Sequence, residues 1–327
     1  MALETPTIPH DVGAREATDD KALSELIGAL KAQSYRFVTP TPATHARLLA
    51  RSCGRPARDL RDIFGWNMPF PAHLVDDALL AQLHAAGHVE ESEHGLRSRV
   101  RVSSLGPDLF VHSAFPTDST DAVFFGPDSY RFAALIAREL RRFPERPGAR
   151  LVDIGTGAGV GAIAAARCCP AVEIVMTDIN PAAIRFARLN AATAGVAAMF
   201  HVSADLSPVP GPLDLLLANP PYIVDPTGRA YRDGGGLHGA EVSLTMARAA
   251  LPRLAAGGRF ILYTGSAIVG GEDALHTRLA ALAHDYGYAL RYEEIDPDVF
   301  GEELETPGYR DVERIALVGA VFDRPRR

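Results

Sequence analysis

The residues best suited to chemistry form the tetrapeptide Asn219-Pro220-Pro221-Tyr222, which follows the apolar run 213–218. A planar nitrogen in an amide, an aromatic amine or a guanidine is a poor nucleophile, because its lone pair is delocalised. The Asn219 side-chain oxygen and the Pro220 carbonyl can each accept a hydrogen bond from an NH₂ group and hold that lone pair toward an electrophile. The prolines stiffen the turn, and the Tyr222 ring can stack on the planar group. A plain turn at a strand end has the same composition, so the context of the tetrapeptide decides.

That context is a glycine-rich turn upstream, which follows the apolar run 151–154 and precedes a helix-like run, 162–169. Strand, glycine turn and helix are typical of a nucleotide-binding βαβ unit, in which glycines let the backbone approach the ligand. A second apolar run ends at Asp178, where a carboxylate can bind both hydroxyls of a ribose. The residues of the turn are Gly155, Thr156, Gly157 and Gly159.

An acid, Asp153, stands two residues before the first glycine of this turn. A dinucleotide site has the spacing Gly-x-Gly-x-x-Gly and binds a pyrophosphate, which a carboxylate here would repel. The same carboxylate can receive, directly or through water, the ammonium of an amino-acid tail. The spacing therefore favours S-adenosylmethionine over NAD, and together with the tetrapeptide it indicates methyl transfer to a planar nitrogen.

Four motifs in this order, VDIGTGAG, TDIN, SADL and NPPY, resemble those of the class I S-adenosylmethionine-dependent methyltransferases. Within them the chain is similar to the NPPY-bearing group. That group includes release-factor glutamine N5-methyltransferases, adenine N6-methyltransferases of DNA and RNA, and ribosomal RNA guanine N2-methyltransferases. The resemblance implies an α/β fold for residues 121–327: a seven-stranded, doubly wound, Rossmann-like sheet.

The resemblance also implies roles for individual residues. Asp153 would lie near the amino group of the cofactor, Asp178 on the ribose hydroxyls and Asp205 on the adenine amino group, with Leu206 and Ile179 as apolar walls. The cofactor-binding candidates are thus Asp153, Gly155, Thr156, Gly157, Gly159, Asp178, Ile179, Asp205, Leu206 and Asn219. The catalytic candidates, which would hold the acceptor nitrogen, are Asn219, Pro220, Pro221 and Tyr222.

A segment upstream of the glycine turn adds further candidates. Related enzymes have a proline- and acid-containing segment here that closes over the cofactor, which makes Phe125, Pro127 and Arg131 additional cofactor-binding candidates. The alternative is a plain helix start, with Ser129 or Asp128 as the N-cap.

The whole chain has the composition of a globular protein. Its 327 residues are 47% hydrophobic and 22% charged, which is ordinary for a globular chain long enough for two domains. No apolar run has the length of a membrane span, and the acidic N-terminus does not resemble a signal peptide, so we expect a cytoplasmic protein. The three cysteines have no metal-binding or disulfide spacing, so neither a metal nor a disulfide is expected.

The N-terminal part has a different organisation. Residues 1–20 are expected to be flexible. Residues 21–115 read as a smaller, winged-helix-like domain, in which helix-like runs precede a β-ribbon over 95–102 and 108–113. The helix-like runs cover residues 21–34, 43–52, 59–64 and 72–86.

Winged helices often bind nucleic acid, but the charge argues against it here. The chain holds 33 Lys and Arg against 40 Asp and Glu, whereas a phosphate-binding domain usually shows a basic stripe. A solvated face is therefore favoured over a nucleic-acid patch, and the module can instead bind a protein, cap the active site or mediate dimers. The candidate basic residues are Arg47, Arg51, Arg55, Arg58 and Arg61, with Arg97, Arg99 and Arg101 on one face of the ribbon.

Two segments follow the tetrapeptide. The glycine-rich segment 229–239 is placed to border the substrate, and His238 is interpreted as part of this loop rather than as a base. The segment 296–309 carries many acidic side chains. It could contact a cationic substrate, but a solvated hairpin is the favoured interpretation.

Three acceptors are compatible with this sequence. A glutamine side-chain amide in a protein comes first, because of the glycine-rich loop and the absence of a basic domain. A nucleobase amine of RNA or DNA comes second, and a small-molecule amine or guanidine third. A cofactor-binding protein without catalysis is disfavoured by the intact tetrapeptide. The sequence leaves the oligomeric state open.

Overall fold

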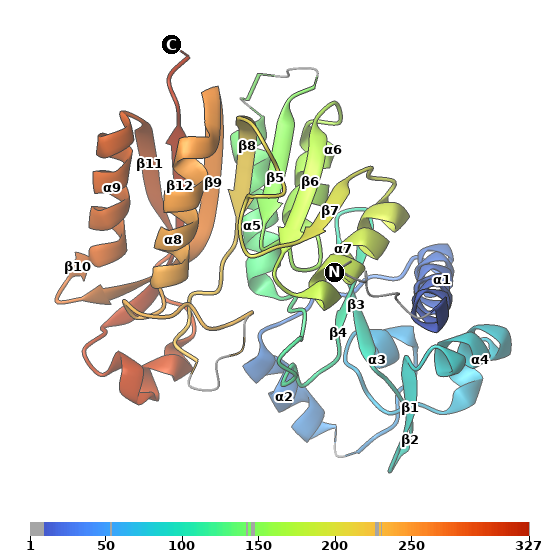
Figure 1. The fold of residues 1–327 in the computed structure, drawn as a ribbon. Helices are drawn as coiled ribbons and strands as arrows, with labels where there is room; N and C mark the ends of the chain where they lie inside the picture. Colours follow the sequence, from blue (N-terminus) through green and yellow to red (C-terminus); the bar gives the residue numbers. More distant parts are fainter. Residues whose placement is uncertain are drawn as a thin grey trace, which may run out of the picture. The chain divides into compact units, whose positions relative to one another are not determined.

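In the computed structural model, the chain divides into two units, residues 1–117 and 118–327, whose elements are drawn in Figure 1. The structure describes residues 10–52, 54–141, 143–144, 148–225, 229 and 231–326. No helix within these ranges is long and apolar enough to cross a membrane. Residues 1–9 of the expected flexible segment, and Cys53, lie outside the described residues.

The first unit consists of helices followed by two antiparallel hairpins. Its first helix begins at His10 rather than at Lys21, because the residues between them include good helix formers. The next three α-helices are preceded by the N-cap residues Thr41, Asp59 and Asp76, whose side-chain oxygens accept hydrogen bonds from first-turn amides. The elements are α1 (His10–Ala32), α2 (Pro42–Arg51), α3 (Leu60–Phe64), η1 (Ala72–Leu74), α4 (Asp77–Ala85), β1 (Val89–Ser92), β2 (Gly95–Ser98), β3 (Val100–Leu105) and β4 (Asp108–Ser113).

The hairpins correct the single strand expected over 95–102. The Ser98 hydroxyl donates a hydrogen bond to the Val100 carbonyl and accepts one from the Val100 amide. Such a local side-chain contact competes with the strand ladder. The chain breaks there, so that β2 pairs back with β1 and β3 pairs forward with β4. The winged-helix-like assignment of this unit stays a prediction.

The break also separates the arginines that were expected to share one face of a ribbon. Arg101 is only 3% exposed and donates a hydrogen bond to the Ser113 carbonyl, while Arg99 lies 3.6 Å from Glu90. In the other basic series, Arg55 and Arg58 both approach a carboxylate oxygen of the buried Asp62. Four of the candidate basic residues are therefore either buried or close to an acidic side chain.

The second unit is built on a mixed sheet with the strand order β11-β12-β9-β8-β5-β6-β7. Strands β9, β8, β5, β6 and β7 are parallel, whereas β12 is antiparallel to both β9 and β11. The seven-stranded doubly wound sheet is confirmed, with a two-residue strand, β10, added beside β9. The strands are β5 (Arg150–Ile154), β6 (Glu173–Asp178), β7 (Met199–Val202), β8 (Leu213–Ala218), β9 (Leu254–Val269), β10 (Glu272–Asp273), β11 (Ala289–Asp296) and β12 (Arg314–Asp323).

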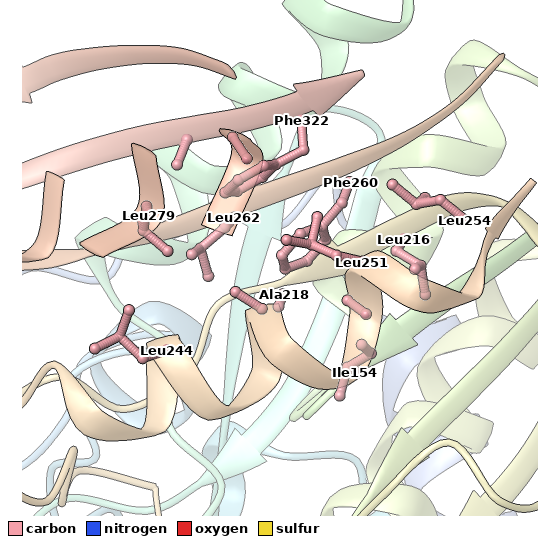
Figure 2. Close-up of a cluster of buried hydrophobic side chains, with 14 of the residues drawn as sticks. Ile154, Leu216, Ala218, Leu244, Leu251, Leu254, Phe260, Leu262, Leu279 and Phe322 are labelled. Atoms are coloured by element: carbon pink, nitrogen blue, oxygen red, sulfur yellow. The ribbon is translucent and has the colours of Figure 1, made fainter. Parts of the chain in front are cut away.

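Helices cover both faces of this sheet, because successive strand side chains point to opposite sides. On the opposite face from the α8 and α9 cluster, Phe132 of α5 lies beside Tyr263, and Leu135 lies beside Gly319. The helices are α5 (Pro127–Leu140), α6 (Val160–Cys168), α7 (Pro181–Ala194), α8 (Glu241–Ala250), η2 (Leu251–Arg253) and α9 (Ala274–Tyr286). Figure 2 shows the core cluster between the sheet and helices α8 and α9, which includes Leu244, Leu279, Phe260, Leu262 and Phe322.

Candidate active site

The glycine-rich turn follows β5 and leads into α6. Gly155, Gly157 and Gly159 have φ values of 64°, 54° and 85°, a region that residues with a Cβ rarely adopt. A Cβ added at Gly157 would meet no heavy atom within 4 Å. The turn is therefore an open backbone cradle at the end of the strand, as the sequence predicts for a nucleotide ligand.

Asp153, in strand β5, forms hydrogen bonds with the turn and with the start of α6. Its side chain is buried, and its Oδ2 accepts hydrogen bonds from the Thr156 hydroxyl at 2.7 Å and the Ala162 amide at 3.0 Å. Burial raises the pKa of Asp153 to about 7, although these two hydrogen bonds act in the opposite direction. A buried carboxylate of this kind is stabilised in its ionised form by a nearby cation. The residue fits the ammonium group of the expected cofactor.

Asp178 stands at the end of the neighbouring strand, β6. Its Oδ2 accepts a hydrogen bond from the Gly157 amide and its Oδ1 accepts one from the Asn180 amide, both at 2.9 Å. Burial raises the pKa of Asp178, and the backbone hydrogen bonds oppose that shift. Each carboxylate oxygen has further lone-pair capacity, so Asp178 fits the predicted binding of ribose hydroxyls.

The residues expected around the adenine differ in exposure. Asp205 is exposed, and its Oδ1 accepts hydrogen bonds from the Ser203 hydroxyl and the Ser207 amide. These contacts lower the pKa of Asp205, the one with Ser207 most. Of the two expected apolar walls, Ile179 is 62% exposed, whereas Leu206 is only 4% exposed and belongs to the core. All three roles stay predictions.

Asn219 lies at the same edge of the sheet as the glycine-rich turn. Strands β5 and β8 pair in parallel with Ile154 opposite Ala218, so Gly155 and Asn219 leave adjacent strands at the same level. The Asn219 side chain is half-buried and has no hydrogen bond to any described residue. Pro220 is buried after it. The geometry therefore places an amide with unused hydrogen-bonding capacity beside the glycine-rich turn, at the edge where open α/β sheets bind their ligands.

Tyr222 ends the tetrapeptide and points into the protein. Its side chain is 7% exposed, and its hydroxyl donates a hydrogen bond to Asp128 Oδ2 at 2.8 Å. The Tyr263 hydroxyl donates to the other oxygen of the same carboxylate at 3.0 Å. Burial raises the pKa of Asp128 and also raises the pKa of Tyr222, which keeps this tyrosine a donor. Its stacking on an acceptor group stays a prediction, and the observed contacts fix the far end of its ring.

The glycine-rich segment packs on the backbone of this tetrapeptide. A Cβ added at Gly239 would lie 2.2 Å from the Tyr222 carbonyl oxygen, and one at Gly234 would lie 2.7 Å from the Tyr222 Cα. The Gly234 amide also donates a hydrogen bond to the Ile223 carbonyl at 2.8 Å. The glycines are required for this close approach.

The acidic segment 296–309 corrects the expectation of a solvated hairpin. It forms two short helical turns, η3 (Gly301–Glu305) and η4 (Pro307–Tyr309), and folds onto the segment after the tetrapeptide. The buried Tyr309 hydroxyl accepts a hydrogen bond from the Val224 amide at 2.9 Å, and Glu303 pairs with Arg232. Its aromatic residues Phe300 and Tyr309 pack against the protein, and this explains why the solvated hairpin that the acidic composition alone suggested is not formed.

The additional cofactor candidates upstream lie in or next to α5. Phe125 is fully buried and Pro127 is the first residue of the helix. Arg131 donates a hydrogen bond to Asp296 at 2.9 Å and lies 3.8 Å from Asp128. The helix N-cap is Gly126, so the alternative that Ser129 or Asp128 caps the helix is wrong. The helix starts earlier because proline is favoured at its first position.

The sequence reasoning missed the contacts that organise the acceptor side. The sequence presents Asp128 only as a possible helix cap and gives no signal for Tyr263. No local spacing connects either residue with Tyr222. Among the described residues, no group of three or more potential metal ligands comes together.

Comparison with known proteins finds similarity to several proteins described as methyltransferases. A family model described as the methyltransferase small domain matches residues 134–279. The release factor glutamine methyltransferase of Deinococcus radiodurans is 28% identical over 86% of this chain and 96% of its own length. The protein of the same name from Cereibacter sphaeroides is 34% identical over 37% of this chain and 48% of its own length. Among solved structures, a ribosomal protein L11 methylase from Lactobacillus delbrueckii subsp. bulgaricus covers 61% of this chain and 81% of its own, with 19% identity and a TM-score of 0.40.

Proposed function

Because this chain belongs to the class I S-adenosylmethionine-dependent methyltransferases, we propose that it methylates the side-chain amide nitrogen of a glutamine in a protein. The half-buried Asn219 amide at the edge of the sheet, beside the glycine-rich turn, carries the proposal. Relatives named as release factor glutamine methyltransferases support the acceptor class. A release factor is therefore the first protein to test.

The cofactor, S-adenosylmethionine, supplies the methyl group as a sulfonium electrophile when it is bound. The residues that would hold it are Asp153 for the amino group, the turn 155–159 for the methionine and ribose portions, and Asp178 for the ribose hydroxyls. Asp205 would contact the adenine. The protein's contribution is mainly proximity and orientation, because the sulfonium already provides the driving force.

On the acceptor side, the Asn219 side-chain oxygen and the Pro220 carbonyl would accept the two hydrogens of the glutamine NH₂ group. That arrangement keeps the amide plane fixed and turns the nitrogen lone pair toward the methyl group. The new N–C bond would replace the S–C bond of the sulfonium, and the nitrogen would lose its proton to solvent only afterwards, so a general base is not required before transfer. Asn219 would therefore act by orientation alone.

The test is transfer of tritiated methyl from S-adenosylmethionine into a purified release factor, with mass spectrometry of the labelled peptide. Label on a glutamine side chain is the expected result. Asn219→Ala should abolish the label while the dissociation constant of the cofactor stays unchanged. Asn219→Asp, which keeps an acceptor oxygen, should retain more turnover than the alanine variant.

A second assay offers RNA, DNA and the small-molecule fraction of a cell extract to the same enzyme. Label in nucleic acid or in a small molecule, with none in protein, would overturn the glutamine assignment. The arginines of the first unit that pair with acids or lie buried give a nucleic-acid acceptor no specific support. The cytoplasmic location expected from the sequence stays a prediction.

A further inference from the structure

A buried carboxylate, Asp128, occupies the first turn of α5 next to the acceptor turn 219–222. It is 7% exposed, and each of its oxygens accepts a hydrogen bond from a tyrosine hydroxyl. One of these tyrosines, Tyr222, ends the acceptor turn; the other, Tyr263, belongs to β9. Burying a carboxylate costs free energy unless it is well hydrogen-bonded, so this one is held in a defined position.

The same helix also contacts the first turn of α6, which directly follows the glycine-rich turn. Phe132 follows Asp128 by four residues, which places both side chains on one side of α5. A Cβ added at Gly161 would lie 2.7 Å from the Phe132 ring and 2.8 Å from Asp153 Oδ1. The start of α5 thus contacts the acceptor turn through Asp128, and it packs through Phe132 against the start of α6, directly after the glycine-rich turn.

We propose that Asp128 is a positioning residue that, through Tyr222, fixes the acceptor turn at a set distance from the glycine-rich turn. The inference rests on the proposed methyl transfer at Asn219. In-line transfer requires the nitrogen and the methyl carbon to meet at a defined separation, and small displacements reduce the rate steeply. Asp128 sets this separation because α5 is also fixed, by Phe132, on the cofactor side.

Three glycines pack closely against Tyr222, so the position of its ring depends on the hydrogen bond that its hydroxyl donates to Asp128. Gly234 and Gly239 enclose its Cα and carbonyl, and Gly265 faces its ring, where an added Cβ would lie 2.3 Å from Tyr222 Cδ2. Without Asp128, the buried hydroxyl would have to find another acceptor. The ring would then tilt, and the turn that carries Asn219 would move with it.

The ion pairs around Asp128 extend this arrangement to the segment 296–309. Arg131 lies 3.8 Å from Asp128 and donates a hydrogen bond to Asp296 at 2.9 Å. Four residues after Asp296, Phe300 has a left-handed φ of 55° and its ring centre lies 6.1 Å from that of Tyr222. The acceptor turn is therefore held from the helix and from the C-terminal segment together.

The experiment compares Asp128→Ala, Asp128→Asn and Tyr222→Phe with a matched control, Tyr292→Phe. The control removes another tyrosine hydroxyl that donates to a carboxylate, Asp273, at 2.7 Å. We expect Asp128→Ala and Tyr222→Phe to lower kcat by on the order of 10- to 100-fold while the dissociation constant of S-adenosylmethionine changes by less than about threefold. Asp128→Asn, which can still contact both hydroxyls, should restore most of kcat, and the control should keep it.

Two further readouts separate positioning from folding. The double variant Asp128→Ala with Tyr222→Phe should be no slower than Asp128→Ala alone, because the contact between Tyr222 and Asp128 is already absent in that single variant. Amide hydrogen exchange at Ile223 and Gly234 should accelerate in Asp128→Ala but not in Tyr292→Phe. This readout needs no acceptor, so it decides the inference even if the release factor is not methylated.

Three results would overturn the inference. One is additive losses of kcat in the double variant. Another is a rise in the dissociation constant of the cofactor as large as the loss of kcat. The third is unchanged exchange at Ile223 and Gly234 in Asp128→Ala.

Discussion

The cofactor side and the acceptor side of this site are built in different ways. Asp153 is held by donors three and nine residues away in the sequence, and Asp178 by one that is 21 residues away. On the acceptor side, Tyr222 contacts Asp128 across 94 residues and Val224 contacts Tyr309 across 85. The cofactor side is thus a local structure of one βαβ unit, whereas the acceptor turn depends on helix, sheet and C-terminal segment.

This difference implies that substitutions on one side should impair cofactor binding and substitutions on the other should impair turnover. A local site tolerates changes elsewhere in the unit, because its geometry is fixed by the strand and the turn themselves. A site assembled from distant segments is sensitive to any of them, since each contributes one contact. Substitutions can therefore be chosen that affect binding of the cofactor or turnover, but not both.

Among substitutions that leave the tetrapeptide 219–222 itself intact, the largest effect should come from Gly239→Ala on the acceptor side. An added Cβ would lie 2.2 Å from the Tyr222 carbonyl oxygen, and φ is 94°. The turn must move, so we expect kcat to fall by about 10²-fold or more. The dissociation constant of S-adenosylmethionine should stay close to that of the wild type in calorimetry.

The matched control is Gly270→Ala. Gly270 also has a positive φ, 60°, but a Cβ there would meet nothing within 4 Å. It tests backbone strain without a collision, and it should leave kcat nearly unchanged. Equal losses in both variants would mean that strain alone, rather than contact with the acceptor turn, determines turnover.

Asp178→Ala should produce the opposite separation. It removes the carboxylate predicted to bind the ribose hydroxyls and also frees the Gly157 amide. Hydrogen bonds to a charged group contribute enough that we expect the cofactor to bind about 10- to 100-fold more weakly. At saturating cofactor, kcat should remain within about threefold. A kcat that stays low at saturation would show that the two sides are not independent.

The ionisation of Asp153 should make cofactor binding depend on pH. Burial raises its pKa to about 7, so the carboxyl is largely protonated below that pH. A bound ammonium favours the ionised form, and affinity should therefore rise by up to about tenfold per pH unit as the pH approaches 7, then level off. Asp153→Asn cannot ionise and should remove this dependence in calorimetry between pH 5.5 and 8.5.

The same shift gives a sign for stability. The folded protein binds the Asp153 proton more tightly than the unfolded chain, where the pKa is 3.8. The contribution of this group to the free energy of unfolding is therefore greatest at low pH and falls as the pH rises from about 4 to about 7. Asp153→Asn removes this pH dependence, so the unfolding temperature of the variant minus that of the wild type should be higher at pH 8 than at pH 5. An unchanged difference would mean that Asp153 titrates normally.

The strand, turn and strand-end acid of the cofactor side can be read from the sequence because they are local, whereas their binding roles stay predictions. A strand, a glycine turn and an acid at the next strand end are each written within a short stretch, and the parallel pairing of β5 with β6 and β8 brings them together. The seven-stranded, doubly wound sheet also agrees with the expectation. Asn219 could be placed because it follows a buried strand directly.

The rest could not be predicted, because it depends on contacts that no spacing records. Asp128 and Tyr263 are 135 residues apart, and each looks unremarkable in its own segment. The acidic composition of 296–309 suggested solvation, but Tyr309 is only 1% exposed and anchors the segment. In the first unit, one serine, Ser98, divides an alternating run that otherwise reads as a single strand.

The smallest effect should come from Asp205→Asn, at the exposed end of the cofactor side. Asparagine keeps an oxygen that can accept the hydrogen bonds from Ser203 and Ser207 as well as one from the adenine amino group. In water-exposed positions such a contact adds little, so the cofactor should bind only about two- to fivefold more weakly. Calorimetry of Asp205→Asn beside Asp205→Ala measures this, with the alanine variant weaker because it also loses the turn contacts. A change in kcat at saturating cofactor would contradict the separation of the two sides, because the hydrogen bonds of Asp205 within the described chain are made with Ser203 and Ser207 and not with residues 219–222.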